Sequence, residues 1–305
     1  MTAGMTMGMG WLHDLPDVRD FNINTADVKP KHKALGQKPI VAMLKQVGVT
    51  EPARALPASV DLKAWCSPIE NQLNIGSCTA NAGIGVLEYF ERRAFGGAWV
   101  DASRLFLYKV TRNLLGWAGD TGAYLRSTMS ALVLFGAPPE RYWPYVVANF
   151  EVEPTAFVYA LAQNYQAISY YRLDPPGTAP AVLLDRIKTY LAAGLPSMFG
   201  FTVYNSIGQD NTGKIPFPAA GDQVAGGHAI VAVGYDDTLQ IKNNKPGSVA
   251  TTGALLIRNS WGTGWGAQGY GWLPYQYVLS GLAVDWWSVL KSEWVETGQF
   301  GIQPH

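Results

Sequence analysis

The spacing of apolar residues changes near residue 195, and this change constrains the fold more than any other feature of the chain. Before it, apolar side chains recur every three to four residues, which predicts helices over 77–94, 103–113, 122–135, 154–165 and 180–193. After it, runs rich in Val, Ile, Phe and Tyr predict strands over 197–204, 228–235, 254–259 and 270–273. Helices followed by strands indicate an α+β protein with two lobes.

Composition excludes several classes of function. The 305 residues carry 23 basic and 23 acidic side chains, which argues against a nucleic-acid partner because phosphate backbones select basic surfaces. Hydrophobic residues make up 48%, so the chain is not disordered as a whole. The apolar runs are shorter than the ~18 to 20 residues that cross a bilayer, and the first ten residues lack the basic and apolar regions of a signal peptide. We expect no membrane partner and a cytoplasmic location by default, with export by another route left open.

Cys78 follows Gly76 and Ser77 at the start of the helix predicted over 77–94. The free N–H groups and partial positive charge of a helix N-terminus lower the pKa of a thiol and favour the thiolate, which is the nucleophile. The alternative is that Cys78 is a small buried hydrophobic residue. The other cysteine, Cys66, is expected to be a buried free thiol, with a redox bond to Cys78 as the alternative.

A nucleophilic thiolate needs a proton-carrying partner, and His228 is the best candidate. It lies at the entry of a predicted strand, whereas the other histidines lie near the chain ends, at His13, His32 and His305. Asn259 ends the strand predicted over 254–259, so its amide would reach the imidazole if the two strands pair. Trp261 would then shield that hydrogen bond from water. A core histidine and an Asn that opens a turn are the alternatives.

Together these segments resemble the papain-like cysteine peptidases. Gln72 precedes Cys78 by six residues, Gly-His occurs at 227–228, and Asn-Ser-Trp-Gly occurs at 259–262. The resemblance covers roughly residues 56–275. Three positions depart from the family pattern: its disulfide cysteine before the nucleophile is Ile75, its Trp after the nucleophile is Thr79, and its Gly after the Gln is Leu73. The chain therefore resembles a prokaryotic-style branch that lacks the usual disulfides.

The resemblance implies a role for each residue. Cys78 attacks the scissile carbonyl as thiolate, His228 pairs with it as imidazolium and protonates the leaving amine, and Asn259 orients His228. The Gln72 side chain and the Cys78 backbone N–H form the oxyanion hole, and Trp261 and Ser260 support the site. Five residues are expected to contact substrate: Gly76, Ser77, Thr121, Gly122 and Gly227. The strand at 198–202 is expected to line the pocket for the residue before the cleaved one.

The family also implies an architecture and a reaction. The fold is a papain-like two-lobe fold, with a helical left lobe over about 66–185, an antiparallel β-barrel-like right lobe over about 186–290, and the cleft between them. The peptidase domain spans 56–290, followed by a tail at 291–305. The expected activity is a cysteine endopeptidase that cleaves peptide or protein substrates through an acyl-enzyme, with no cofactor and no metal. The alternatives are a thiol acyl-transferase or peptide ligase on the same fold, and an inactive papain-like binding module.

Residues 1–55 differ in texture from the rest of the chain. A polar run at 29–33 and several prolines surround one short amphipathic stretch at 40–47. The segment at 11–21 looks like the N-terminal extension of bacterial relatives. We consider two interpretations: a propeptide-like segment that covers the cleft, and a structural brace on the body. If the first holds, removal of residues 1–55 is expected to raise peptidase activity.

Overall fold

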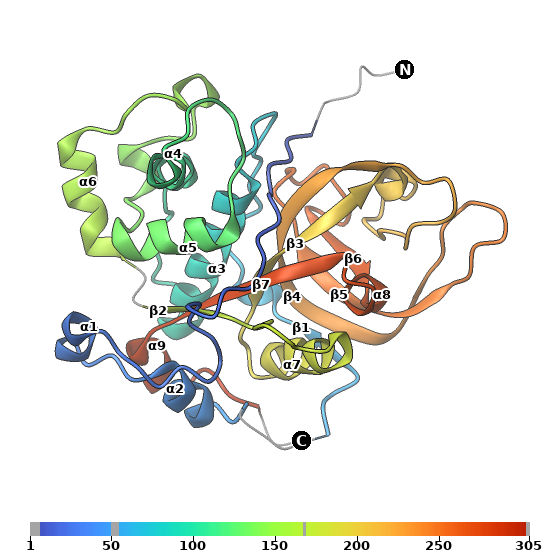
Figure 1. The fold of residues 1–305 in the computed structure, drawn as a ribbon, viewed down its shortest axis with the longest axis horizontal. Coiled ribbons are helices and arrows are strands. Elements are labelled where there is room, and N and C mark those ends of the chain that lie inside the picture. The colour runs from blue at the N-terminus through green and yellow to red at the C-terminus, as the bar shows by residue number, and fades with distance from the viewer. Residues whose placement is uncertain (1–6, 50–54, 167–168, 303–305) are drawn as a thin grey trace.

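The computed structural model describes residues 7–49, 55–166 and 169–302. The α-helices are α1 (Pro30–Ala34), α2 (Ile40–Gln46), α3 (Cys78–Ala94), α4 (Arg104–Leu115), α5 (Leu125–Leu134), α6 (Ala156–Ala162), α7 (Pro180–Ala192), α8 (Tyr275–Leu279) and α9 (Ser292–Glu296). The strands are β1 (Ser59–Asp61), β2 (Ser169–Arg172), β3 (Ser197–Tyr204), β4 (Val224–Ile241), β5 (Thr251–Arg258), β6 (Tyr270–Pro274) and β7 (Ala283–Leu290). Helices α3 to α6 gather on one side of the molecule, and the curved sheet lies on the other together with α7 and α8, which confirms the predicted α+β, two-lobe fold (Figure 1).

The helical lobe is built around α3, which is buried along most of its length. Helices α4 and α5 pack against it and against each other. The Ser103 hydroxyl caps α4 by accepting a hydrogen bond from the N–H of Phe106 at 3.1 Å, and Gly116 ends the helix in the left-handed conformation. These caps set the position of the loop that follows α4 and borders the cleft.

The sheet is antiparallel throughout, in the order β2-β7-β3-β4-β5-β6, and β1 pairs with β4. Strand β4 lies at its centre, with β3 on one side and β5 on the other. Beyond Asp236, β4 and β5 continue as a hairpin whose pairing reaches Ile241 and Thr251. The long connection between His228 and Asn259 therefore contains a hairpin extension of these two strands.

Each predicted strand is present, and three further strands were not predicted. Strands β1 and β2 span only 3 and 4 residues, too few to give a periodic signal. Strand β7 is buried on both faces for most of its length, so polar and apolar residues do not alternate in it. Its pairing with β3 places Asp285 beside the interlobe region, and the sequence pattern gave no indication of this.

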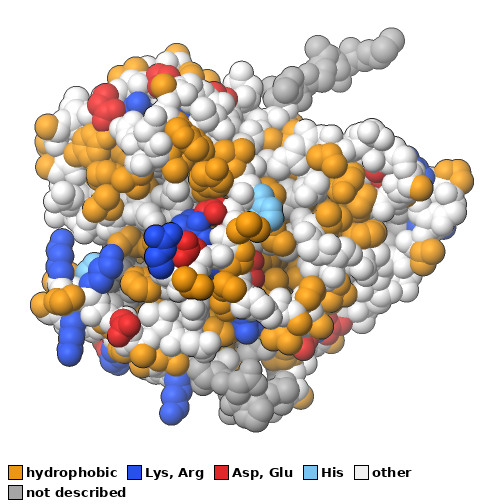
Figure 2. Space-filling model, in the orientation of Figure 1, with side chains coloured by type: hydrophobic (Ala, Val, Ile, Leu, Met, Phe, Trp, Pro, Cys, Tyr) orange, Lys and Arg blue, Asp and Glu red, His pale blue; other side chains and the backbone are white. Residues whose placement is uncertain are grey.

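Both ends of the described chain pack onto the body. Met43 and Leu44 on α2 are fully buried. Trp294 on α9 is also fully buried and stacks on Phe90 of α3, with ring centroids 5.1 Å apart. Figure 2 shows Lys and Arg side chains over α1 and α2, so this part of the extension presents a basic outer face. Residues 40–49 thus fit the brace interpretation.

The segment that precedes α1 follows a different course. It runs between the helical lobe and the sheet, and residues 8–12 bond to both (Figure 1). This part fits the covering interpretation, so the two interpretations of residues 1–55 apply to different parts of one segment.

Cys66 and Cys78 are both free and buried, as expected for a branch without disulfides. Among the helices that the structure describes, we find none of the length and apolarity that a membrane span requires.

Candidate active site

Cys78 is the first residue of α3, and its surroundings hold it there firmly. Ser77, the N-cap residue, lies 2.6 Å from the Tyr145 hydroxyl through its Oγ, and the Asn81 amide donates to Ser77 O at 3.0 Å. Tyr145 also donates to the carbonyl of Gln72 at 3.0 Å. One tyrosine thus ties the Gln72 loop to the start of the helix that carries the thiol.

His228 lies on β4 and is fully buried. Its Nε2 atom lies 2.8 Å from Oδ1 of Asn259, the residue that follows β5. The Trp261 ring stacks on the imidazole with a centroid distance of 4.5 Å and an interplanar angle of 20°. Nδ1 has no hydrogen-bond partner among the described residues, so it is the nitrogen available for chemistry.

Cys78 and His228 lie on elements from the two lobes that pack against each other, at the start of α3 and on β4. The backbone of Ala229, the residue after His228, acts to lower the pKa of the buried Cys78 thiol. The structure brings His228, Asn259 and Trp261 together in one cluster, as their sequence positions predicted.

Gln72 is fully buried, and its side-chain amide is oriented by two contacts. Its Oε1 accepts the Ser260 hydroxyl at 2.6 Å, and its Nε2 donates to the carbonyl of Ile75 at 3.0 Å. Ser260 O also accepts the Gln72 backbone N–H at 2.8 Å. Because Ser260 follows Asn259 directly, one short segment contacts both the His228 ring, through Asn259, and the Gln72 side chain, through Ser260.

Burial keeps the thiol and the imidazole neutral in this state. It raises the pKa of Cys78 to about 12, although the backbone N–H groups of Ala229 and Gly10 act in the opposite direction. Burial also lowers the pKa of His228 to about 4, against the smaller opposite effect of its bond to Asn259. Both groups are therefore neutral near pH 7 in this buried arrangement.

The cover is the chain's own N-terminal segment. Gly8 N–H donates to Leu73 O at 3.0 Å, and Gly8 O accepts the Trp261 indole N–H at 3.1 Å. A Cβ on Gly10 would overlap the carbonyl of Gly76 just before the thiol. Glycine at position 10 is thus required for the backbone to lie this close to the nucleophile.

Trp11 is the most deeply placed side chain of the cover. Its backbone N–H donates to Gly227 O at 3.2 Å, and its indole N–H donates to Oδ2 of Asp285 at 3.1 Å. The residues on either side of it bond to Ala123: the N–H of Ala123 donates to Gly10 O at 2.8 Å, and Leu12 N–H donates to Ala123 O at 3.1 Å. The segment forms a short ladder along the wall of the helical lobe.

The expected substrate contacts divide into two groups. Gly76, Gly122 and Gly227 all touch the covering segment, since a Cβ at any of them would approach or overlap its backbone. Ser77 instead turns inward to Tyr145, and the Thr121 hydroxyl bonds to Gly122 O at 3.1 Å. The three glycines are therefore the better candidates for contact with a bound peptide.

Two residues that position the site were not identified from the sequence. Asp120 accepts the N–H of Gly76 at 2.8 Å and the Tyr108 hydroxyl at 2.5 Å, which holds the loop before Cys78. Arg258 donates to Ser67 Oγ at 3.0 Å and Pro68 O at 2.7 Å, linking β5 to the other lobe. A charged residue inside an otherwise apolar strand was the available signal for Arg258.

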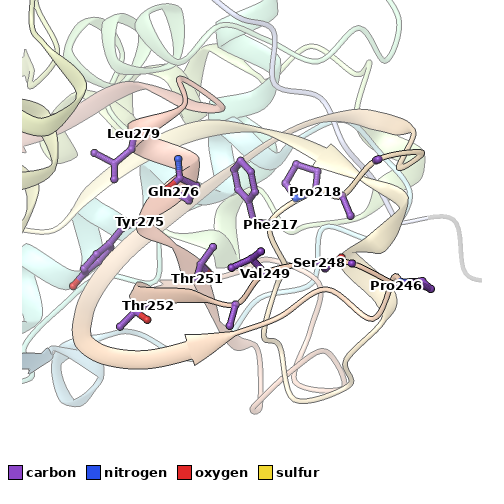
Figure 3. Close-up of a pocket in the computed structure, with 14 residues that line it drawn as sticks. Phe217, Pro218, Pro246, Ser248, Val249, Thr251, Thr252, Tyr275, Gln276 and Leu279 are labelled. Carbon is purple, nitrogen blue, oxygen red and sulfur yellow. The ribbon is translucent and has the colours of Figure 1, made fainter.

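Two other features are unconnected with this cluster. A groove of about 630 Å³ lies on the outer side of the sheet lobe, between α8 and the loop before β5, and none of the predicted catalytic residues lines it (Figure 3). Over the described ranges, we find no group of three or more His, Cys, Asp or Glu side chains suited to a metal ion.

A thiol at a helix N-terminus and an imidazole held by an amide under a tryptophan, placed on a helical and a sheet lobe that pack together, are typical of the papain-like class of cysteine peptidases. The family model for papain family cysteine proteases matches residues 56–283. The chain therefore belongs to the papain family.

Similar proteins come from distant sources. An uncharacterized peptidase C1-like protein, L477, of Acanthamoeba polyphaga mimivirus is 30% identical and covers 94% of this chain and 88% of its own length. Xylellain, a cysteine protease from Xylella fastidiosa, has a solved structure that is 30% identical, with a TM-score of 0.70 over 95% of this chain and 98% of that one. Chicken cathepsin K is 27% identical over 70% of this chain and 58% of its own length. Bromelain from Ananas comosus, solved in complex with the E64 inhibitor, shares the fold at 17% identity and a TM-score of 0.56, over 78% of this chain and 100% of that one.

Proposed function

We propose that the chain is a cysteine endopeptidase that acts through Cys78 and His228. The observation that carries the proposal is the His228 ring: Asn259 holds its Nε2, Trp261 covers its face, and its Nδ1 has no hydrogen-bond partner among the described residues. The strand that carries this ring packs against the helix that begins at Cys78. An imidazole fixed in this way can take the thiol proton and return it to a leaving group.

The reaction follows from these positions. The Cys78 sulfur attacks the carbonyl carbon of the scissile bond, and the Gln72 amide and the Cys78 backbone N–H stabilise the oxyanion. The His228 imidazolium gives its proton to the departing amine as the carbon–nitrogen bond breaks and a thioester remains. Water, deprotonated by His228, then attacks the thioester and releases the acid and the free thiol.

We also propose that residues 8–12 hold the chain in a low-activity state. They lie against Leu73, Gly76 and Gly227, where a substrate backbone would have to lie. With this segment in place, a substrate carbonyl has no route to the thiol.

The test uses the full chain with Gly8→Ala and Gly10→Ala, because each added Cβ overlaps a backbone carbonyl and displaces the segment without truncation. This displaced chain is incubated with an unfolded protein in ¹⁸O-labelled water that contains a primary amine. Hydrolysis places ¹⁸O in the new carboxyl group, whereas transfer produces an amide of the added amine.

We expect ¹⁸O-labelled peptides, and none when Cys78→Ala is added. Amide products in place of acids would favour the acyl-transferase or ligase alternative. Cleavage that is equal with and without Cys78 would overturn the proposal, and absence of any product together with an unreactive Cys78 would favour the inactive binding module.

A further inference from the structure

The Trp11 side chain occupies a slot that the two central strands leave open for it. A Cβ at Gly200 on β3 would overlap the Trp11 ring at Cε2, and a Cβ at Gly227 on β4 would lie 2.9 Å from its Cε3. Two neighbouring strands thus have no side chain at the positions beneath one bicyclic ring. The slot is flat and buries all but 7% of the tryptophan.

The end of the slot is polar. Asp285 on β7 is fully buried, and its two oxygens have different partners. Oδ1 accepts the Trp287 indole N–H at 2.7 Å and lies 3.0 Å from Nη1 of Arg172. Oδ2 accepts the Trp11 indole N–H at 3.1 Å. When Trp11 leaves, Oδ2 loses this donor, and a ligand that fills the slot and excludes water must supply another, because an unsatisfied buried acceptor is costly.

The carboxylate has a fixed direction. Asp285 has φ +62°, a left-handed conformation that is uncommon for a residue other than glycine. Asp174 holds this backbone by accepting the N–H of Asp285 at 2.9 Å and of Trp286 at 3.0 Å. The carboxylate at the end of the slot is therefore oriented before any ligand arrives.

The slot lies close to the turn that precedes the thiol. The backbone of Gly10 packs against Gly76, two residues before Cys78, and Trp11 follows Gly10 along the wall formed by Ala123. Gly200 belongs to the stretch 198–202 that is expected to line the pocket for the residue before the cleaved one. A substrate in the same trough would place that residue's side chain in the slot.

We propose that Asp285 is a specificity-determining residue. The slot selects a flat aromatic side chain with an N–H donor, and prefers tryptophan, in the substrate residue that directly precedes the one whose carbonyl is attacked. This inference rests on the proposed peptidase function. Leucine and phenylalanine would fill the slot but leave Oδ2 unsatisfied. Arginine could reach Oδ2, but Asp285 is already paired with Arg172, so a neutral indole suits the site better than a second buried cation.

Asp285→Asn provides a sharp test because it reverses the polarity of the slot. The Trp287 indole N–H donates to the Oδ1 position, and the positively charged Nη1 of Arg172 lies 3.0 Å from it, so both favour the amide oxygen of the variant at that position. Its NH₂ group then takes the Oδ2 position and presents a donor where the native residue presents an acceptor. Asparagine also tolerates the left-handed backbone.

The experiment uses the full chain with Gly8→Ala and Gly10→Ala, so that the slot is open. Peptide amides that differ only in the residue before the cleaved one carry Trp, benzothienylalanine, Phe, Leu or Arg. Benzothienylalanine is the matched control, since it replaces the indole N–H with sulfur and keeps the bicyclic shape. We expect kcat/KM for Trp to exceed that for benzothienylalanine by about tenfold, as for a hydrogen bond to a charged group. In Asp285→Asn the ratio is expected to fall to about one or below.

A ratio near one in the parent, a ratio that Asp285→Asn leaves unchanged, or a preference for Leu, Phe or Arg would overturn the inference. If Asp285→Asn does not fold, the ratio of kcat/KM for the Trp peptide to that for the benzothienylalanine peptide in the parent chain tests the inference alone. If no peptide is cleaved, the proposed peptidase function is wrong, and the selectivity of the slot is tested by binding instead. The dissociation constants of the same peptides are then measured with the Cys78→Ala form. Tighter binding of Trp than of benzothienylalanine would support it, and equal binding would contradict it.

Discussion

Nε2 of His228 lies 2.8 Å from Oδ1 of Asn259, and this contact determines which ring nitrogen is free for the thiol. Asn259→Ala removes the acceptor and leaves a buried ring nitrogen without a partner. Loss of such a bond costs about 1–3 kcal/mol, so we expect kcat to fall roughly 10- to 100-fold. Peptide hydrolysis by the displaced chain, Gly8→Ala with Gly10→Ala, measures this. Unchanged kcat would show that the ring needs no orientation by Asn259.

Gln72 is expected to contribute to the transition state and not to substrate binding. Gln72→Ala removes one oxyanion donor, which is typically worth about 10²–10³ in kcat. We expect KM to change little, because the donor acts on charge that develops only during the reaction. Ser260→Ala is the matched control, since it removes only the hydroxyl that orients the Gln72 amide, and its effect should be much smaller. A rise in KM at constant kcat would contradict the assignment.

The covering segment can lie this close to the Ile75–Gly76 turn because positions 8 and 10 are glycines. Gly8→Ala with Gly10→Ala places each new Cβ against a backbone carbonyl of the Ile75–Gly76 turn, and such atoms cannot move aside as a flexible side chain can. We therefore expect hydrolysis by the full chain to increase. Gly208→Ala is the control, because a Cβ there meets open space. Equal activity in the wild-type chain and the double variant would exclude a blocking role for residues 8–12.

The pH dependence of thiol alkylation should change with the cover. In the covered chain burial raises the pKa of Cys78 to about 12 and lowers that of His228 to about 4, so the thiolate forms only at alkaline pH. Uncovering admits water, raises the pKa of His228 toward its ordinary value and lowers that of Cys78 below 9.0 as the ion pair forms. The midpoint of the alkylation rate at Cys78 should thus move to lower pH in the Gly8→Ala, Gly10→Ala chain. Coincident midpoints would contradict this account.

Much of the site could be predicted from the sequence because its residues occur in short motifs on regular elements. Cys78 at a helix start, His228 on a predicted strand and Asn259 after another were identified in this way, and strand pairing brings the last two together. Strand β4 begins at Val224, four residues before the predicted start at His228, because the residues before His228 carry no apolar run. Asp285 and Trp11 could not be found similarly. They are 274 residues apart, and their contact depends on β7 pairing with β3 and on two glycines beneath the ring. A local pattern carries no information about such a long-range fit.

The account depends most on a reactive thiol at Cys78. The most direct measurement is labelling of the Gly8→Ala, Gly10→Ala chain near pH 7 by an epoxide thiol inhibitor, with mass spectrometry to locate the adduct. Cys66, which is buried and free, is the internal control. The account predicts an adduct on Cys78 that forms faster than on a free thiol, none on Cys66, and loss of labelling in His228→Ala. Labelling of Cys78 no faster than that of a free thiol would contradict it.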